Sequence, residues 1–396
     1  MNVCGIVCEY NPFHNGHLYQ LKKAKAAGAD AVICIMSGNF VQRGDFAVMQ
    51  KSARAKAAVM CGADVVIELP LPYALSSAET FAYGAVSILE KLKAVSHISF
   101  GAECENTDAL LAVAKLLSSS TLDTEITEEY KKGISYASAR ENAVRKINPE
   151  LSDILQKPNN ILAVEYLKAL LRTNSKILPI AVKRCGAEHD SDLSENGFAS
   201  ASHIRELILA EKDIRDLLPK ESFEVFKEEC LCGHAPISAT SASSAVLASL
   251  KRLTAEDFKK YRDVTEGLEN RLFEAVSEST TLSDAITRAK TKRYAHSRIR
   301  RIFLNAFLDI DATLASKEVP YARVLAFSER GREVLKVAKK VSEIPIITKP
   351  ASIKFESKEA IDLLALEKRA DDIYSLFMEI PEEQGSTLRK SPDFIL

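Results

Sequence analysis

The sequence predicts an α/β protein that begins with a doubly wound parallel sheet and continues into a mostly helical part. Short apolar runs such as Asp-Ala-Val-Ile-Cys-Ile-Met at 30–36 lack the polar alternation of a half-exposed strand. These runs alternate with segments of helical spacing, as in βαβ units. Residues 240–316 are instead rich in Ala, Leu, Ser, Arg and Lys with helical periodicity. We therefore expect one unit over residues 1–220 and a second, mostly helical unit over 221–396.

The elements of the first unit follow in order. Its expected strands are short, apolar and bounded by turns: residues 3–8, 30–36, 64–69, 97–100 and 177–182. Its expected helices have apolar positions three or four residues apart: residues 18–27, 50–61, 77–92, 161–171 and 200–210, with 107–150 mainly helical. Gly28 and Gly62 follow the first two helices and are typical helix ends. Further along, residues 321–327 and 344–349 are candidate strands, and residues 331–341 a candidate helix.

The composition excludes several classes of protein. With 46% hydrophobic and 27% charged residues, the chain is neither mainly disordered nor a fibre or coiled-coil rod. Lys and Arg number 53 against 54 Asp and Glu, so the protein is not coated in positive charge, although a local basic face remains open. No run approaches the ~20 apolar residues of a membrane helix, and the N-terminus does not resemble a secretory signal. We expect a cytoplasmic protein with no membrane partner.

The eight cysteines do not indicate a disulfide framework. Most lie among apolar neighbours, as in Ile33-Cys34-Ile35, and we expect small buried side chains in a reducing compartment. Cys230-x-Cys232-x-His234 is too tightly spaced for a zinc finger. We therefore expect no protein metal site.

The strongest chemical signal is His14-Asn15-Gly16-His17, between the first strand and the first helix. A loop after the first strand is where doubly wound folds bind phosphate. Gly16 allows close approach, and the following helix start offers unpaired N–H groups. Two imidazoles can donate to phosphate oxygens whose charge grows during attack at an α-phosphorus. The alternative is a pair of surface histidines at a helix start.

This motif resembles that of the HxGH nucleotidylyltransferases, relatives of class I aminoacyl-tRNA synthetases with a Rossmann-like sheet. The resemblance implies attack on the α-phosphate of a nucleoside triphosphate with release of pyrophosphate, and makes His14 and His17 the catalytic pair. Ser200-Ala201-Ser202-His203-Ile204-Arg205 is similar to the later signature of that superfamily, where Ser200, Ser202 and Arg205 would hold the triphosphate. An ordinary helix cap beside a surface arginine is the alternative for this stretch.

A narrower resemblance covers nearly the whole chain. It rests on residues 5–17 (Gly-Ile-Val-Cys-Glu-Tyr-Asn-Pro-Phe-His-Asn-Gly-His), 36–44, 63–70, 100–103, 158–162, 182–184, 266–271 and 290–294. These segments resemble the bacterial tRNA(Met) cytidine acetate ligase family. The resemblance implies that ATP and acetate form acetyl-adenylate, and that the acetyl group passes to N4 of the wobble cytidine of elongator tRNA(Met). Mg²⁺ is expected to accompany the triphosphate.

The same resemblance implies the ATP-binding positions. They are Val7, Cys8, Glu9, Tyr10, Asn11, Pro12, Phe13, His14, Asn15, Gly16, His17, Leu18, Tyr19, Gln20, Gly101, Asn159 and Arg184. Asn159 is preferred over the adjacent Asn160 on the resemblance alone, since a turn and helix cap would also explain this pair.

Other polar residues are weaker candidates. Residues 37–40 follow the second strand and are candidates to line an acetate or cytidine pocket. Arg43 and Lys51 are candidates to balance a carboxylate or triphosphate, with solvated basic side chains as the alternative. Three carboxylates near strand ends are candidates to hold Mg²⁺ or to act as base on the cytidine amine: Glu9, Glu68 and Glu103.

A basic stretch lies in the second half. Its proposed RNA contacts are Lys290, Lys292, Arg293, Tyr294, Arg298 and Arg301. On one helix these residues would form a basic face with an aromatic ring for an unstacked base. Intramolecular pairing or solvation is the alternative.

Two other functions stay open at this point. A small-molecule nucleotidylyltransferase would explain the histidine motif and should ignore tRNA. A non-catalytic RNA-binding protein would explain the basic stretch and should not bind ATP.

Overall fold

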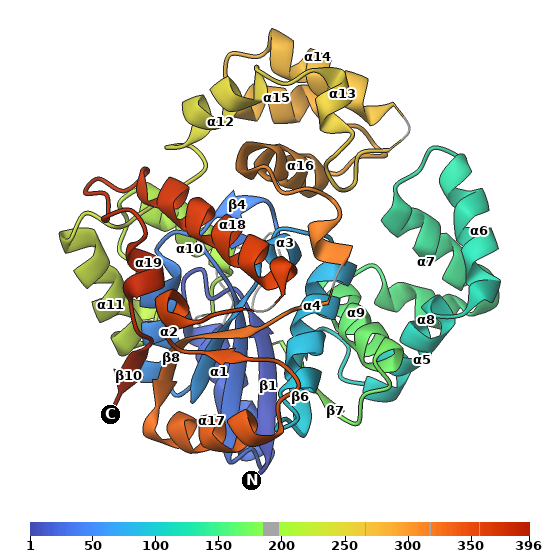
Figure 1. The fold of residues 1–396 in the computed structure, drawn as a ribbon. Helices are drawn as coiled ribbons and strands as arrows, with labels where there is room; N and C mark the ends of the chain where they lie inside the picture. Colours follow the sequence, from blue (N-terminus) through green and yellow to red (C-terminus); the bar gives the residue numbers. More distant parts are fainter. Residues whose placement is uncertain (185–197, 266, 317, 356) are drawn as a thin grey trace.

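The computed structural model describes residues 1–184, 198–265, 267–316, 318–355 and 357–396 (Figure 1). Its centre is an eight-stranded sheet in the order β10-β8-β5-β2-β1-β6-β7, with β9 paired to β8. The strands are β1 (Val3–Cys8), β2 (Ala31–Ser37), β5 (Val65–Leu69), β6 (His97–Ala102), β7 (Leu178–Lys183), β8 (Ala322–Ser328), β9 (Ile346–Ile347) and β10 (Asp393–Ile395). Every pair is parallel except β5 with β8. All five strands expected before residue 220 are confirmed.

Helices cover both faces of the sheet, which explains why β2 and β5 are buried at every position. Alternate side chains of β1 and β2 pack on one face against α1 (Asn15–Ala26) and α2 (Lys51–Met60). The other face packs against α4 (Ala78–Lys91) and α9 (Pro158–Arg172). A Cβ on Gly5 would lie 2.6 Å from Leu89 of α4, so the glycine lets this helix approach the central strand. The apolar runs of the sequence therefore reflect burial on two faces.

Smaller elements surround this layer. A helical lobe beside α9 consists of α5 (Thr107–Leu117), α6 (Ser120–Lys131), α7 (Tyr136–Ile147) and α8 (Pro149–Ile154). A short hairpin, β3 (Phe40–Val41) and β4 (Asp45–Phe46), follows β2, and α3 (Leu71–Ala74) follows β5. Further along, α10 (Ala201–Leu209) and α11 (Lys220–Leu231) share an apolar cluster with α2.

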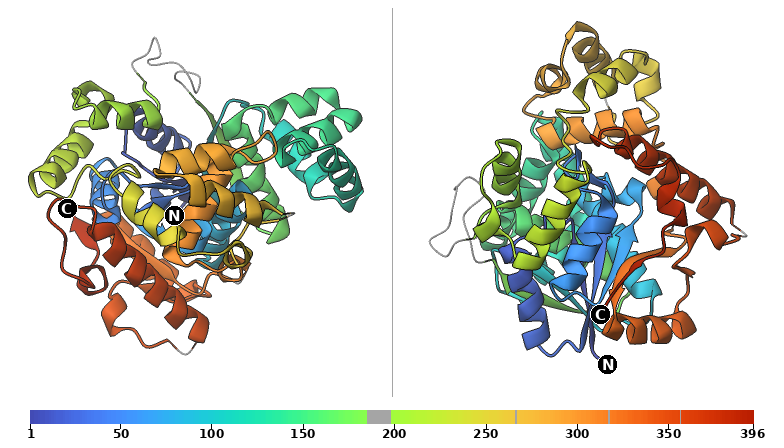
Figure 2. Two further views of the ribbon diagram at one scale, coloured as in Figure 1. Left: turned by 90° about the horizontal axis from the view of Figure 1, so that it is seen from above. Right: turned by 90° about the vertical axis from the view of Figure 1, so that its left-hand side faces the viewer.

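The second half first forms a group of helices beyond the carboxyl ends of the parallel strands (Figures 1 and 2). They are α12 (Ser243–Leu250), α13 (Ala255–Phe258), α14 (Leu268–Glu278), α15 (Leu282–Ala289) and α16 (His296–Leu308). The chain then returns to the sheet with β8, α17 (Glu329–Val341), β9, α18 (Lys358–Ser375), α19 (Ser386–Arg389) and β10.

The expectation that the α/β unit ends near residue 220 is wrong for the sheet. Candidate strand 321–327 is indeed a strand, but it pairs with β5. Without it, the fully buried β5 would have an unpaired edge, which is costly away from water. That residues 221–396 act as a separate tRNA-binding unit stays a prediction.

Two sequence expectations concern cysteines and membranes. Cys4, Cys8 and Cys34 are buried free thiols, whereas Cys232 is exposed; Cys185 lies outside the described residues, as does Glu266 of the resemblance motif. Among the helices that the structure describes, none is long and apolar enough to cross a membrane.

Candidate active site

His14 and His17 form the start of α1 and bind each other's backbone. His14 is the N-cap residue, and its Nδ1 accepts a hydrogen bond from the Gly16 amide at 3.1 Å. His17 Nδ1 accepts from the His14 amide at 3.2 Å. The two rings stack with their centroids 3.7 Å apart. Because each Nδ1 is an acceptor, each neutral ring carries its proton on Nε2, where it can be donated to a ligand.

The surroundings keep both rings neutral. Burial, Arg184 and Arg205 lower the pKa of His14 to about 3. Burial and the neighbouring His14 lower the pKa of His17 well below its usual range. Imidazolium is disfavoured in a desolvated site beside two guanidinium groups. The pair therefore offers two N–H donors, and a polyanion would also relieve the surrounding positive charge.

Arg54 holds the loop before the histidines in place. The sequence analysis did not identify this residue. Arg54 of α2 is fully buried, and its guanidinium donates to the backbone carbonyls of Glu9, Ser37, Gly38 and Met49. It therefore ties the loop after β1 to the loop after β2. An arginine on the Ala-rich, core-facing side of a predicted helix was the available signal.

Tyr10 makes a sharp turn in the same loop. Its φ is +45°, a left-handed conformation that is uncommon for a bulky side chain. The ring is buried against Phe13 and His17. This packing stabilises a conformation that would otherwise cost of order 1–3 kcal/mol.

A cavity of about 540 Å³ opens above this loop. Its apolar lining comes from β6, α4 and α9: Phe81, Phe100, Ile161, Leu162 and Tyr166. Its polar lining consists of Glu9, Asn11, His17, Gln20, Gln42, Arg43, Asn159, Arg184 and Ser297. A cavity that combines apolar side chains with several polar groups is typical of a small-molecule site.

The carboxyl end of β6 organises one corner of the cavity. Arg184 donates to Asn159 Oδ1 at 3.0 Å, and Asn159 Nδ2 donates to Glu103 Oε1 at 2.6 Å. Asn160 is instead buried, and its Oδ1 accepts from the backbone amides of Glu103 and Cys104. A Cβ on Gly101 would lie 3.3 Å from the Arg184 side chain. Asn159 therefore faces the cavity and Asn160 supports the turn.

Arg205 of α10 reaches the histidine loop, whereas Ser200 and Ser202 make local contacts; that these three residues hold the triphosphate stays a prediction. Arg205 donates to the carbonyl of Asn11 at 2.9 Å, which links α10 to the histidine loop. Ser200 Oγ accepts from the His203 amide as a helix cap, and Ser202 Oγ lies 3.4 Å from Arg205. Of this segment, only Ala201 lines the main cavity.

The remaining expected ATP positions divide into three groups. The main cavity is also lined by Val7, Cys8, Tyr10 and Gly101. A smaller adjoining pocket of about 60 Å³ is lined by His14, Gly16 and Tyr19. Neither is lined by Pro12, Phe13, Asn15 or Leu18: Phe13 is fully buried, and Asn15 donates to the carbonyl of Asp216.

Lys51 and Glu68 do not line the cavity, contrary to their candidacy for ATP and Mg²⁺. Lys51 Nζ lies 2.5 Å from Glu68 and 2.6 Å from Asp371 of α18. Arg323 of β8 lies 3.3 Å from the same glutamate. This buried ion network joins the returning C-terminal chain to the carboxyl edge of the sheet.

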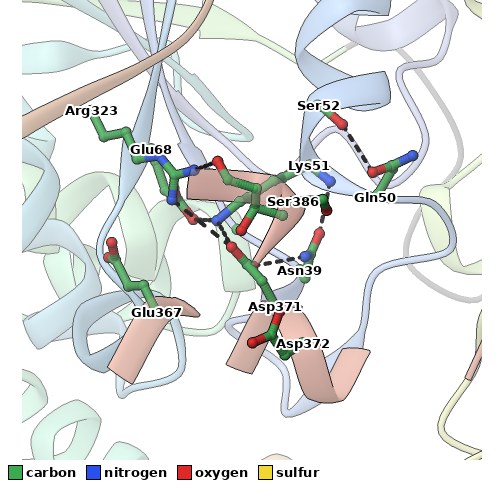
Figure 3. A network of polar contacts seen from close by, with 12 residues as sticks. Asn39, Gln50, Lys51, Ser52, Glu68, Arg323, Glu367, Asp371, Asp372 and Ser386 are labelled. Carbon is green, nitrogen blue, oxygen red and sulfur yellow. Dashed lines mark hydrogen bonds and ion pairs between the residues drawn. The ribbon is translucent and has the colours of Figure 1, made fainter. Parts of the chain in front are cut away.

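Asn39 belongs to the same network, and none of residues 37–40 lines the main cavity. Asn39 Nδ2 donates to Asp371 Oδ1 at 2.9 Å, and Asn39 Oδ1 accepts from the Lys51 amide at 2.7 Å (Figure 3). The expectation that this segment lines an acetate or cytidine pocket is therefore not met by the main cavity.

The basic stretch is not one helical face. Residues 290–295 lie between α15 and α16 without helical structure. Tyr294 is buried, so its ring is not available to stack on a base, and Arg301 is buried too. Arg298 donates to the carbonyl of Asp263 at 2.6 Å. The helix and stacking expectations are wrong, because these side chains hold the helical group together.

Other members of the stretch reach the surface or a neighbour. Lys290 and Lys292 are exposed. Arg293 lies over the ring of Tyr130 in α6, 4.3 Å from its centroid, and so connects the helical group to the lobe. An RNA contact by these three residues stays a prediction.

Known proteins resemble this chain over its whole length. Residues 1–389 match the HIGH Nucleotidyl Transferase family. The tRNA(Met) cytidine acetate ligase of Caldicellulosiruptor saccharolyticus is 42% identical over an alignment of 387 residues that covers 95% of this chain and 94% of that protein. The protein of the same name from Halothermothrix orenii is 38% identical over 422 residues, covering 100% and 99%.

Solved structures agree with these relatives. The apo crystal structure of Thermotoga maritima TmcAL has a TM-score of 0.94 at 34% identity and covers 100% of both chains. The structure of TmcAL with alpha-thio ATP has a TM-score of 0.92 at 33% identity, covering 100% and 99%. The chain therefore belongs to the HIGH nucleotidyl transferase family and, within it, to the tRNA(Met) cytidine acetate ligases.

Proposed function

We propose that this protein activates acetate with ATP and transfers the acetyl group to N4 of the wobble cytidine of elongator tRNA(Met). Acetyl-adenylate is the intermediate, and pyrophosphate and AMP are released. The observation that carries the proposal is the cavity beside two neutral imidazoles and Arg184, in a chain 38–42% identical to proteins named for this activity. The alternative of a small-molecule nucleotidylyltransferase uses the same cavity.

In the first step, an acetate oxygen attacks the α-phosphorus and pyrophosphate leaves. Negative charge grows on the phosphate oxygens in the transition state. The Nε2–H groups of His14 and His17 are already oriented by their backbone bonds, so they can stabilise this charge without rearranging. Arg184 and Arg205 supply full positive charge, and the N-terminus of α1 adds its unpaired amides.

The apolar lining of the cavity is suited to a flat base. Phe100 and Tyr166 lie with ring centroids 5.9 Å apart beside Leu162, and Gly101 leaves space at the end of β6. Such a surface buries a purine face, while Asn159 offers a polar contact near the ribose. We assign the adenosine to this lining and the triphosphate to the histidines.

Mg²⁺ is proposed to arrive with the triphosphate. Among the described residues there is no group of three His, Cys, Asp or Glu that could hold an ion alone. The absence of such a group among the described residues suits an ion whose ligands are mainly phosphate oxygens and water. No step above depends on it.

The RNA partner and the location follow from the proposed reaction. Lys290, Lys292 and Arg293 lie on the helical group beyond the cavity, where phosphates of an anticodon arm would contact them. A cytoplasmic location is proposed because bacterial tRNA is found there.

The test is acetylation of bulk bacterial tRNA with purified protein, ATP and labelled acetate, followed by nucleoside analysis. Label in N4-acetylcytidine that depends on ATP and tRNA is the expected result. A H14A/H17A double variant should not form the adenylate. Pyrophosphate release that persists in that variant would refute the assigned role of the histidines, and turnover indifferent to tRNA would favour the small-molecule alternative.

A further inference from the structure

We propose that the carboxylate of Glu9 accepts the proton that the attacking cytidine amine loses during acetyl transfer. This inference rests on the proposed function and assigns a residue to its second step. It follows from which proton acceptors the cavity contains, how they are already bonded, and where they lie.

The described lining of the cavity offers one carboxylate. Among the described residues that line it, Glu9 is the only acidic one. Glu103 lies nearby, but its two oxygens accept from the Asn159 side chain and the Asn160 amide. Glu68 is buried and bound by Lys51 and Arg323. Among these three carboxylates, Glu68 is bound by two cations and both Glu103 oxygens already accept a hydrogen bond, so Glu9 has the least engaged oxygens.

The histidines cannot take this role in the state that the structure shows. Each Nδ1 lone pair already accepts a backbone N–H, and each Nε2 carries the proton. Neutral rings of this tautomer donate to the cavity and have no free lone pair toward it. The imidazoles are therefore suited to bind the phosphates, and the Glu9 carboxylate is suited to accept the proton.

Glu9 is held in place with one oxygen available. Its Oε1 accepts from the Gln42 amide at 2.7 Å, and its backbone carbonyl accepts from Arg54. Within the described part of the chain, the structure gives Oε2 no hydrogen-bond donor. The left-handed turn at Tyr10 follows directly, so the carboxylate lies on a rigid segment. A general base needs this combination of fixed position and free lone pairs.

Glu9 also lies beside the β3–β4 hairpin, which contacts the helical group proposed to bind RNA. Gln42 and Arg43 of the hairpin and Ser297 of α16 line the cavity. Arg300 of α16 lies 2.7 Å from Asp45, which attaches the hairpin to the helical group. A base that reaches the cavity past Gln42 and Ser297 would bring its exocyclic amine toward Glu9, whereas the phosphates are assigned to His17 and Arg184.

The step balances without another reagent. The amine nitrogen forms a bond to the acetyl carbon, and the bond from that carbon to the AMP oxygen breaks. The nitrogen loses one proton to the Glu9 carboxylate, which later passes it to water. AMP leaves as the anion.

The two half-reactions separate this proposal from the proposed function. Acetate-dependent exchange of labelled pyrophosphate into ATP reports adenylate formation without RNA. Acetyl transfer is measured by single-turnover mixing of the enzyme-bound adenylate with tRNA. In Glu9→Gln, the amide oxygen can still accept from the Gln42 amide, so the loop should fold, which a melting curve checks. Exposed Glu105→Gln is the matched control.

We expect Glu9→Gln to keep exchange near the wild-type rate while transfer falls about 10²- to 10⁴-fold. Transfer at the wild-type rate, or exchange lost in parallel with transfer, would overturn the proposal; parallel loss would place Glu9 in ATP or Mg²⁺ binding. An absence of acetate-dependent exchange in the wild type would instead count against the proposed function.

Discussion

The neutral state of His14 predicts how the ATP-free protein responds to acid. The perturbation is His14→Asn. Asparagine is a favoured N-cap residue, and its side-chain oxygen can accept from the Gly16 amide as His14 Nδ1 does. The variant therefore removes the titrating ring while keeping the helix start.

The expected magnitude follows from the two pKa values of the imidazole. An unfolded chain has a histidine pKa of about 6.5. In the fold, burial and then Arg184 and Arg205 lower the pKa of His14 to about 3. Because the folded pKa is lower, the unfolded state binds more protons between these values, and stability falls as the pH falls through 6.5. From pH 7 to pH 5, the wild type should lose about 2 kcal/mol more than the variant.

Urea denaturation of both proteins at pH 7 and pH 5 measures this difference. Carboxylates away from the site titrate in both proteins and cancel to first order. His17 contacts the substituted ring, but burial is the largest cause of its lowered pKa and persists in the variant, so its contribution stays similar. Saturating ATP should reduce the difference, because a phosphate at Nε2 favours imidazolium. Equal losses in the two proteins, within about 0.5 kcal/mol, would refute the claim that the fold keeps His14 neutral.

Three other substitutions test the architecture around the cavity. Arg184→Met should weaken ATP binding about 10- to 100-fold by calorimetry, since a charge-assisted contact to phosphate is lost, and an unchanged Kd would contradict its assigned role. Arg54→Met should lower the free energy of unfolding by about 3 kcal/mol or more, because buried carbonyls lose their donor. The exposed control Arg252→Met should change the free energy of unfolding by less than about 0.5 kcal/mol. Similar changes in the two variants would contradict the role of Arg54. Gly44→Ala should cost about 1–3 kcal/mol more than Gly133→Ala in urea denaturation. Both glycines have positive φ, but only at Gly44 would a Cβ lie 2.6 Å from the Arg301 amide. Equal losses of stability in these two variants would mean that α16 shifts to make room for the added Cβ.

Local patterns were enough to predict β1, β2, β5, β6, β7 and the histidine loop, but not the short strands β3 and β4. Runs such as residues 31–37 are buried on both faces, and this leaves a continuous apolar signature. The pairing of β8 with β5 could not be predicted from the sequence, because nothing in residues 65–69 indicates a partner strand so far along the chain. Pairing over that distance is decided by the whole fold rather than by local sequence.

The site shows the same limit at the level of side chains. The motif placed His14 and His17 together, but only the structure shows that each Nδ1 is used, which determines what the rings can do. Arg298, Arg301 and Tyr294 have the composition of an RNA surface, yet they are engaged in internal packing. Charge patterning cannot distinguish a solvated arginine from one that binds a backbone carbonyl.

The strand order also constrains synthesis of the protein on the ribosome. The edge of β5 that β8 covers is completed only by residues 322–328, after roughly 250 more residues have been translated. At about 5–20 residues per second, a buried apolar strand would wait some tens of seconds for its neighbour. During that interval the nascent chain exposes an edge prone to incorrect pairing. Chaperone occupancy of ribosome-bound chains should therefore persist until the last quarter of the sequence emerges.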